Sequence, residues 1–305
     1  MHFLNVLSLV ACLFTIALGQ NLTLYDQIKS HNATTFLRLI EKEGLASILQ
    51  NPSDGPYTLL VPTDKAFAKL PPDDLHRVEH NSQALQEVIQ YHLIHGANLE
   101  HDFLFGRHYF LKSKNGHVVR VYRSATGTHF NQATAVKSDI QASNGVMYLI
   151  NSVLDVPEGT VVDILGNIAY NTSDFLHLIK LARLQTNYAN PTGLNRYTVF
   201  APNNAAMAAM PAAHLEAIKN DTTNLRMFIE YHVHSGTMHI GTVEKHHTIR
   251  TTLPNHNIAV TPDTTGDVLL DHIAHITLSD IEAENGVVHV IDHVLMPQIL
   301  TPIIG

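Results

Sequence analysis

YTLLVPTDKAFAKLP, residues 57–71, decides the fold, because the chain repeats it almost letter for letter as YTVFAPNNAAMAAMP, residues 197–211. Each copy begins with five apolar or β-branched residues ahead of a proline, which predicts a strand buried on both faces. Side chains that can cap a helix follow, as Thr-Asp at residues 63–64 and Asn-Asn at residues 203–204. A short apolar helix should therefore begin there and end at the next proline. The chain is predicted to contain two copies of one unit.

The repeat continues along the chain at a nearly constant offset. FLRLI at residue 36 matches FLHLI at 175, YHLIHG at 91 matches YHVHSG at 231, and SDIQASNGVMYLINSVL at 138 matches SDIEAENGVVHVIDHVL at 279. The first pair has the spacing of an amphipathic helix, and a second helix is predicted ahead of each Tyr-His pair. Short strands should follow, the last two joined through Asn-Gly, which is a hairpin-turn signal. Because helices come first and strands last, each copy is predicted to be an α+β domain with a mostly antiparallel sheet.

The N-terminus and the length predict the domain organisation. Residues 1–20 are an uncharged, mainly apolar run that is typical of a secretory signal peptide, although the usual Lys or Arg is missing. The repeat then divides the rest into domains at residues 21–157 and 158–300, with a joint at 156–160 and a C-terminal tail at 301–305. No later apolar stretch is long enough to span a bilayer, and the C-terminus lacks a lipid-anchor pattern. We expect a secreted, extracellular protein with no transmembrane or lipid anchor.

Composition argues against several classes of function. The chain has 27 acidic and 19 basic residues and no basic cluster, so we expect no nucleic-acid partner. Its one cysteine, Cys12, lies in the expected signal peptide. The sequence motifs of serine hydrolases, zinc proteases, phosphate-binding loops and dinucleotide-binding folds are absent. The 22 histidines include no sequence-local pair spaced to chelate an ion, which leaves only a metal site built across strands. We expect no catalytic residue, no cofactor and no metal.

The repeated segments resemble the fasciclin (FAS1) domain family. YTLLVPTDKAF and YTVFAPNNAAM are similar to the first box of the family, and NGVMYLINSVL and NGVVHVIDHVL are similar to its second box. The Tyr-His pairs at residues 91 and 231 match the central pair of the family. The second copy departs at Asn203 and Met207, where the family usually has Thr and Phe. The resemblance implies two tandem FAS1 domains, each a mostly antiparallel β-sheet wedge with helices packed around it.

The resemblance also implies candidate binding residues. Family members act in adhesion and matrix organisation, mostly without catalysis, and two short features have been linked to integrin-dependent adhesion. Both occur twice, as the Tyr-His pair and as an Asp-Ile dipeptide: Tyr91, His92, Asp139, Ile140, Tyr231, His232, Asp280 and Ile281. Structural roles are the alternative. The two histidines lie on the apolar stripe of a predicted helix, which favours burial, and each Asp stands where it can tie its own backbone into a turn.

A second functional class is also implied by the resemblance. Some fungal FAS1 proteins similar to this chain, short, two-domain and without an anchor, assist laccase-like multicopper oxidases in the oxidative coupling of aromatic polyketides, within secondary-metabolite pathways. The partner is then either an extracellular protein or cell-wall or matrix component, or a secreted laccase-like oxidase with an aromatic substrate. The sequence leaves both open.

Four segments fit the N-glycosylation pattern, at Asn21, Asn32, Asn171 and Asn220. Asn32 and Asn171 are equivalent positions of the repeat, just ahead of the first predicted helix. Their side chains can instead cap that helix, but the predicted secretion favours a glycan.

Overall fold

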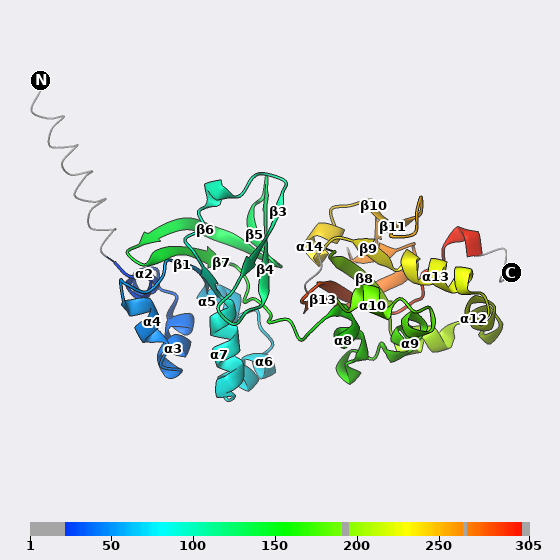
Figure 1. Ribbon diagram of the computed structural model, residues 1–305, viewed down its shortest axis with the longest axis horizontal. Coiled ribbons are helices and arrows are strands. Elements are labelled where there is room, and N and C mark those ends of the chain that lie inside the picture. Colours follow the sequence, from blue (N-terminus) through cyan, green and yellow to red (C-terminus); the bar gives the residue numbers. More distant parts are fainter. Residues whose placement is uncertain (1–21, 191–194, 265–266, 301–305) are drawn as a thin grey trace, which may run out of the picture. The chain divides into compact units, whose positions relative to one another are not determined.

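The computed structural model describes residues 22–190, 195–264 and 267–300. Within the chain, Val156 and Pro157 mark the division between two compact units, which we call the first and second units (Figure 1). The predicted signal peptide, Asn21 and the predicted tail at 301–305 lie outside the described residues.

The first unit is built on a seven-stranded sheet. Its strands are β1 (Tyr57–Pro62), β2 (Leu93–His95), β3 (His108–Lys112), β4 (Val118–Ser124), β5 (Gly127–Phe130), β6 (Ala133–Ala142) and β7 (Gly145–Ile150). Their order is β2-β1-β7-β6-β5-β4-β3, and β1 pairs with β7 in parallel while the other neighbours pair antiparallel. A bridge between Ile94 and Ser113 brings the two edges of the sheet together. The predicted mostly antiparallel sheet is confirmed.

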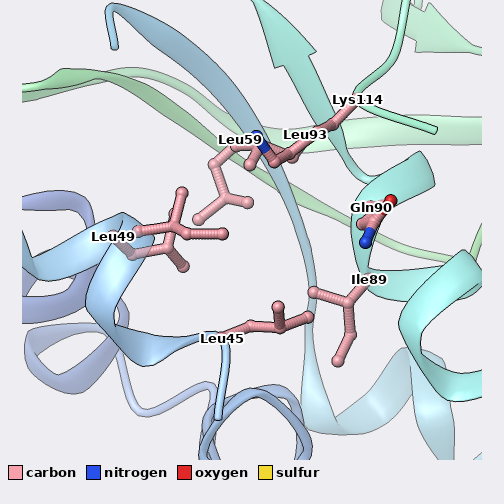
Figure 2. A pocket seen from close by; sticks show the side chains of 8 residues that line it. Leu45, Leu49, Leu59, Ile89, Gln90, Leu93 and Lys114 are labelled. Carbon is pink, nitrogen blue, oxygen red and sulfur yellow. The ribbon is translucent and has the colours of Figure 1, made fainter. Parts of the chain in front are cut away.

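The helices of the first unit gather along one face of β1, β6 and β7 (Figure 1). They are α2 (Leu24–Ser30), α3 (Thr34–Lys42), α4 (Ala46–Gln50), α5 (Asp64–Phe67), α6 (Pro72–Glu79) and α7 (Ser82–Tyr91), and a 3-10 turn η1 (Glu100–Asp102) follows. One apolar cluster lies between these helices and the sheet, with Phe36, Leu59 and Ile89 among its members. Figure 2 shows a pocket in this layer. A second cluster, which includes Tyr91 and Tyr148, lies among the strands.

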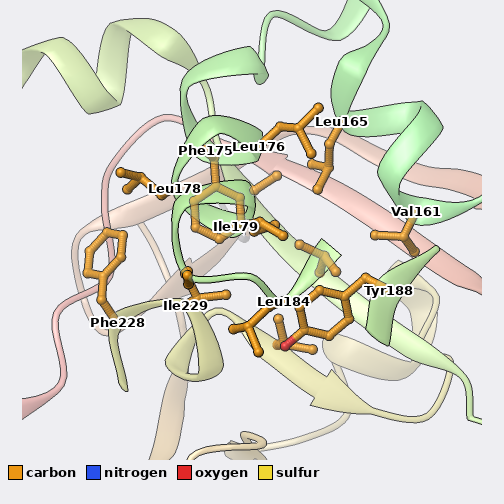
Figure 3. Close-up of a cluster of buried hydrophobic side chains, with 14 of the residues drawn as sticks. Val161, Leu165, Phe175, Leu176, Leu178, Ile179, Leu184, Tyr188, Phe228 and Ile229 are labelled. Atoms are coloured by element: carbon orange, nitrogen blue, oxygen red, sulfur yellow. The ribbon is translucent and has the colours of Figure 1, made fainter. Parts of the chain in front are cut away.

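The second unit repeats this architecture. Its seven strands are β8 (Tyr197–Pro202), β9 (Val233–Ser235), β10 (Thr248–Arg250), β11 (Asn257–Pro262), β12 (Val268–Leu270), β13 (Ala274–Ala283) and β14 (Gly286–Ile291), in the order β10-β11-β12-β13-β14-β8-β9. Its helices are α8 (Val161–Gly166), η2 (Ile168–Tyr170), α9 (Ser173–Leu181), α10 (Gln185–Tyr188), α11 (Asn204–Ala209), α12 (Ala212–Lys219), α13 (Thr222–Tyr231), α14 (Ile240–Val243) and η3 (Gln298–Leu300). Phe175, Ile179 and Ile229 meet in its helix–sheet core (Figure 3).

The repeated opening stretch forms the predicted strand and cap. β1 and β8 are buried after their first residue. Thr63 Oγ1 accepts a hydrogen bond from the Ala66 N–H at 3.2 Å and so caps α5, as predicted. The next residue caps a different helix, because Asp64 Oδ1 accepts from the Thr35 N–H at 2.8 Å in the first turn of α3. The stretch therefore fixes α3 to the end of β1.

The Asn-Gly pairs lie at the predicted hairpins and have a further role. The hairpins form, with Ala142 opposite Gly145 in the first unit, but Asn144 is 3% exposed and does not adopt a positive φ. Its Oδ1 accepts from the Leu24 N–H at 2.8 Å, so it holds the start of α2. A Cβ on Gly145 would lie 2.0 Å from the Tyr57 carbonyl oxygen. The predicted hairpin is confirmed, with Asn144 in its turn, and the glycine is required by the close approach of β1.

Candidate binding residues

The two candidate histidines are core residues. His92 follows the last residue of α7, is 0% exposed and packs against Phe36 at 5.7 Å between ring centroids. Its Nδ1 lies 2.7 Å from the Val88 carbonyl oxygen, and its Nε2 accepts from the Leu154 N–H at 3.0 Å. The ring is therefore neutral with its proton on Nδ1, and burial lowers the pKa of His92 to about 4. The predicted burial is confirmed.

His232 repeats this arrangement in the second unit. It is 0% exposed, its Nδ1 contacts the Phe228 carbonyl oxygen at 2.8 Å, and its Nε2 accepts from the Leu295 N–H at 3.1 Å. Burial lowers the pKa of His232 to about 4. Each histidine ties the end of a helix to the segment that follows the last strand of its unit.

The preceding tyrosines point into the other core layer. Tyr91 is 0% exposed, and its hydroxyl donates to the Val118 carbonyl oxygen at 3.0 Å and accepts from Asn131 Nδ2 at 2.8 Å. Tyr231 is 6% exposed, and its hydroxyl donates to Asp271 Oδ2 at 2.8 Å. Burial and the Asp271 charge raise the pKa of Tyr231. The two members of each Tyr-His pair thus lie in different clusters and form no common surface.

The candidate aspartates lie in β-bulges, which corrects the prediction that they close a turn. Asp139 interrupts the pairing of β6 with β7 at a φ of 55°, and its Oδ1 accepts from the Glu100 N–H and from the Tyr148 hydroxyl, both at 2.8 Å. Asp280 has a φ of 58° in β13, and its Oδ1 accepts from the Ile240 N–H at 2.8 Å. The Asp139 carboxylate therefore fixes the start of η1, and the Asp280 carboxylate fixes the start of α14, each about 40 residues away in sequence. Neither ties its own backbone into a turn.

The isoleucines of the Asp-Ile dipeptides face the helix layer. Ile140 is 8% exposed and belongs to the helix–sheet cluster of the first unit, and Ile281 is partly buried against the equivalent cluster of the second. The structure brings Asp139 close to a hydroxyl of the strand cluster while Ile140 faces the opposite layer. The candidate residues are therefore structural in both units, and an adhesive role for them stays a prediction.

The second unit also contains a buried polar cluster that the sequence did not indicate. His239 Nε2 lies 2.5 Å from Glu282 Oε1, and both side chains are under 10% exposed. His289 Nε2 donates to the Met238 carbonyl oxygen at 2.8 Å, and its Nδ1 accepts from the Asp280 N–H at 3.2 Å. Burial lowers the pKa of His289. These bonds brace α14 against β13 and β14.

Exposed apolar residues are the surface feature that sequence reasoning missed. Leu104 is 56% and Phe105 68% exposed, in the segment between η1 and β3 of the first unit. The Tyr109 hydroxyl accepts from the Leu104 N–H at 2.8 Å, and Phe105 forms a bridge with Arg123. These contacts hold the backbone so that two large apolar side chains face solvent.

The predicted glycosylation sites that are described are exposed, at Asn32, Asn171 and Asn220. Asn32 and Asn171 adopt left-handed conformations with φ of 54° and 53°. Neither side chain caps the helix that follows, because the N-cap residues are Ala33 and Thr172, and Asp64 and Asn204 accept the first-turn N–H bonds instead. The capping alternative was therefore wrong. Glycosylation itself stays a prediction.

Over residues 22–190, 195–264 and 267–300, no three His, Cys, Asp or Glu side chains gather as a metal site would require. None of the helices in the described part of the chain has the length and apolar character to cross a membrane.

The two units are thus repeated α+β domains whose motif residues hold the fold together. The Fasciclin domain family matches residues 31–157 and 170–297, and the chain belongs to this family. Its relatives include transforming growth factor-beta-induced protein ig-h3 of Sus scrofa, which is 26% identical over 276 residues, covering 87% of this chain and 38% of that protein. Periostin of Homo sapiens is 29% identical over 152 residues, covering 48% of this chain and 18% of that protein. The chain therefore spans less than half the length of these curated relatives.

Among solved structures, the FAS1 domain pair from the insect cell adhesion molecule Fasciclin I covers 89% of this chain, and this chain covers 99% of that one. The TM-score is 0.42 and the sequence identity is 18%.

Proposed function

We propose that this chain is a non-catalytic, extracellular binding protein of the adhesion or matrix type. The observation that carries the proposal is the match of the Fasciclin domain family to both units. The relatives named above are similar over one or both units, and adhesion is the role that the family resemblance implies. The partner would be an extracellular protein or a cell-wall or matrix component.

The recognition surface should lie outside the Tyr-His and Asp-Ile dipeptides. Their polar atoms already bond to the protein's own backbone and side chains, and breaking those bonds would cost fold stability. Leu104 and Phe105 are better placed, because both are exposed while their backbone is held in place. Exposed apolar patches mark interaction sites on protein surfaces, and Phe is among the side chains enriched in interfaces.

The test is attachment of cells to a surface coated with the purified chain, compared with the heat-unfolded chain. The double variant Leu104→Ser with Phe105→Ser should reduce attachment, since it removes both exposed anchors. Ile168→Ser is the matched control, because Ile168 is 95% exposed in the second unit and its loss should leave attachment unchanged. Equal attachment to native and unfolded protein would contradict the proposal.

The accessory role beside a laccase-like oxidase is the second candidate, and the apolar pocket of the first unit favours it. In that role the chain would hold an aromatic substrate in a productive geometry, and positioning alone can contribute several kcal/mol to a reaction. The chain alone should leave a phenolic substrate unchanged and should alter the product ratio when a laccase is added. An unchanged product ratio would remove this candidate.

Secretion and glycosylation are part of the same proposal. The mature chain should begin near Gln20 or Asn21 and should lose mass on glycosidase treatment. N-terminal sequencing and mass spectrometry of the product made by a secreting host measure both. A product that retains Met1 and carries no glycan would contradict the extracellular assignment.

A further inference from the structure

The repeat provides an internal comparison, because equivalent backbone positions carry different side chains in the two units. Asn144 Nδ2 donates to the Leu49 carbonyl oxygen at 3.1 Å, and Asn285 Nδ2 donates to the Tyr188 carbonyl oxygen at 2.7 Å. The two asparagines stand at the same place in the two hairpins. Leu49 and Tyr188 are therefore equivalent positions.

In the second unit, this position places a phenol ring in the helix–sheet core. Tyr188 is 4% exposed, packs with Leu184 and Ile229, and meets the Tyr197 ring edge-on at 4.9 Å between centroids (Figure 3). The Thr252 side chain is close enough to the Tyr188 hydroxyl to influence its pKa. Burial, with the nearby charge of Glu230, raises the pKa of Tyr188, so the phenol is neutral. The surrounding residues thus form a preformed site that fits one phenol ring.

In the first unit the corresponding space is a pocket, because leucine replaces the tyrosine. Its walls are Leu45, Leu49, Leu59, Ile89 and Leu93, as Figure 2 shows. Leu49, Leu59, Ile89 and Leu93 are each at most 4% exposed, so the inner wall is fixed by the core.

The polar groups around this pocket also correspond. The Lys114 N–H donates to the Leu93 carbonyl oxygen at 2.7 Å, just as the Thr252 N–H donates to the Val233 carbonyl oxygen at 2.6 Å. Lys114 therefore stands at the position equivalent to Thr252, and it lines the pocket together with Gln90. Its Nζ lies 5.6 Å from the centre of the Tyr57 ring, the equivalent of Tyr197.

The pocket must widen to receive a ring. Its cavity volume is about 10 Å³, which is about the space that a single water molecule requires. Leu45, Ile48 and Lys114 form the partly exposed side of the lining. A ring would have to displace these three side chains, because the rest of the apolar wall is buried in the core.

We propose that this pocket binds a small free phenol, with the ring between the leucines and the hydroxyl oxygen facing Lys114. The neutral ring packs against the apolar wall, and the ammonium group of Lys114 donates a charge-assisted hydrogen bond to the phenol oxygen. The ring edge meets Tyr57 as Tyr188 meets Tyr197. The Leu49 backbone stands where the Tyr188 backbone stands in the second unit, so a ring in this pocket has to belong to a separate molecule, and the smallest such molecule is a free phenol. The proposal concerns binding only and holds for either candidate function.

The test uses p-cresol, which is the tyrosine side chain without its backbone. Titration of the full chain, followed by NMR chemical shifts, should show one site with a dissociation constant on the order of 1 mM, as expected for eight non-hydrogen atoms in a partly open pocket. Leu49→Tyr fills the pocket with the chain's own ring and should weaken binding at least tenfold. No saturable binding to the wild type, or unchanged binding to folded Leu49→Tyr, would overturn the proposal.

Two further variants keep the proposal testable if Leu49→Tyr does not fold. Tyr188→Leu recreates the pocket in the second unit, so p-cresol should bind at two sites instead of one. Lys114→Met should weaken p-cresol binding about tenfold while leaving toluene binding unchanged, since it removes only the partner of the hydroxyl. A single site in Tyr188→Leu, or no effect of Lys114→Met, would contradict the assignment. If acetyl-tyrosine amide binds more tightly than p-cresol, the free phenol is the wrong ligand, and the pocket instead binds a tyrosine side chain of a partner protein.

Discussion

Replacement of His92 by alanine should destabilise the first unit by about 3 to 5 kcal/mol. The Leu154 N–H loses its acceptor and stays buried, which costs about 1 to 3 kcal/mol. The missing ring leaves a cavity beside Phe36, which adds about 2 kcal/mol at the low end of the range for large-to-small core substitutions. The Val88 carbonyl adds little, because it keeps the helical N–H of residue 92 at 3.2 Å.

The pH dependence separates this explanation from a simple cavity. The folded pKa of His92 is about 4 against an ordinary 6.5. Between these pH values His92 binds a proton in the unfolded chain but not in the folded chain. The free energy of unfolding is therefore highest above pH 6.5 and decreases as the pH falls toward 4. A shift of about 2.5 pKa units corresponds to about 3 kcal/mol. The difference in stability between wild type and His92→Ala should therefore shrink by about this amount from pH 7 to pH 4.

Urea unfolding of the full chain at pH 7, 5.5 and 4 measures both effects. His232→Ala is the matched control, because it should weaken the second unit by the same mechanism and leave the transition of the first unit unchanged. An unfolding midpoint of His92→Ala equal to that of the wild type at pH 7 would refute the reasoning. A stability difference that stays constant with pH would refute the neutral buried ring.

Four further outcomes follow from particular contacts. Asn285→Ala should lower the unfolding free energy of the second unit by more than about 2 kcal/mol in urea titrations, because Asn285 is 0% exposed and bonds to the backbone of two segments. Gly145→Ala should prevent folding of the first unit, seen as loss of its cooperative transition, since the added Cβ would meet the backbone of β1. Phe105→Ser should leave the melting temperature within about 2 °C while lowering attachment, because its ring is mainly exposed. Asn32→Gln should reduce the mass of the secreted product by one glycan.

The repeated boxes predicted the strands, the first cap and the burial of the histidines, because these features depend on residues within a few positions of each other. The helices α2 and α8 were missed although the sequence contains their signal. Thr23 and Asp26 form a capping box, as do Thr160 and Asp163. Comparison of the opening of the two copies for a Thr-x-x-Asp pattern would have found both helices.

The roles of Asn144 and Asp139 could not be predicted in the same way. Asn144 bonds to the Leu24 N–H across 120 residues, and Asp139 bonds to the Glu100 N–H across 39 residues. Only the folded sheet brings these groups together, so the local sequence around each residue could not predict these bonds. The pocket at Leu49 depends in the same way on four separated segments.

Attachment of cells to surfaces coated with the purified, folded chain tests the central claim most directly. The chain should support attachment well above that of the heat-unfolded chain, and the Leu104→Ser, Phe105→Ser double variant should reduce it while Ile168→Ser does not. Attachment equal to that of the unfolded protein would contradict the proposed adhesion or matrix function.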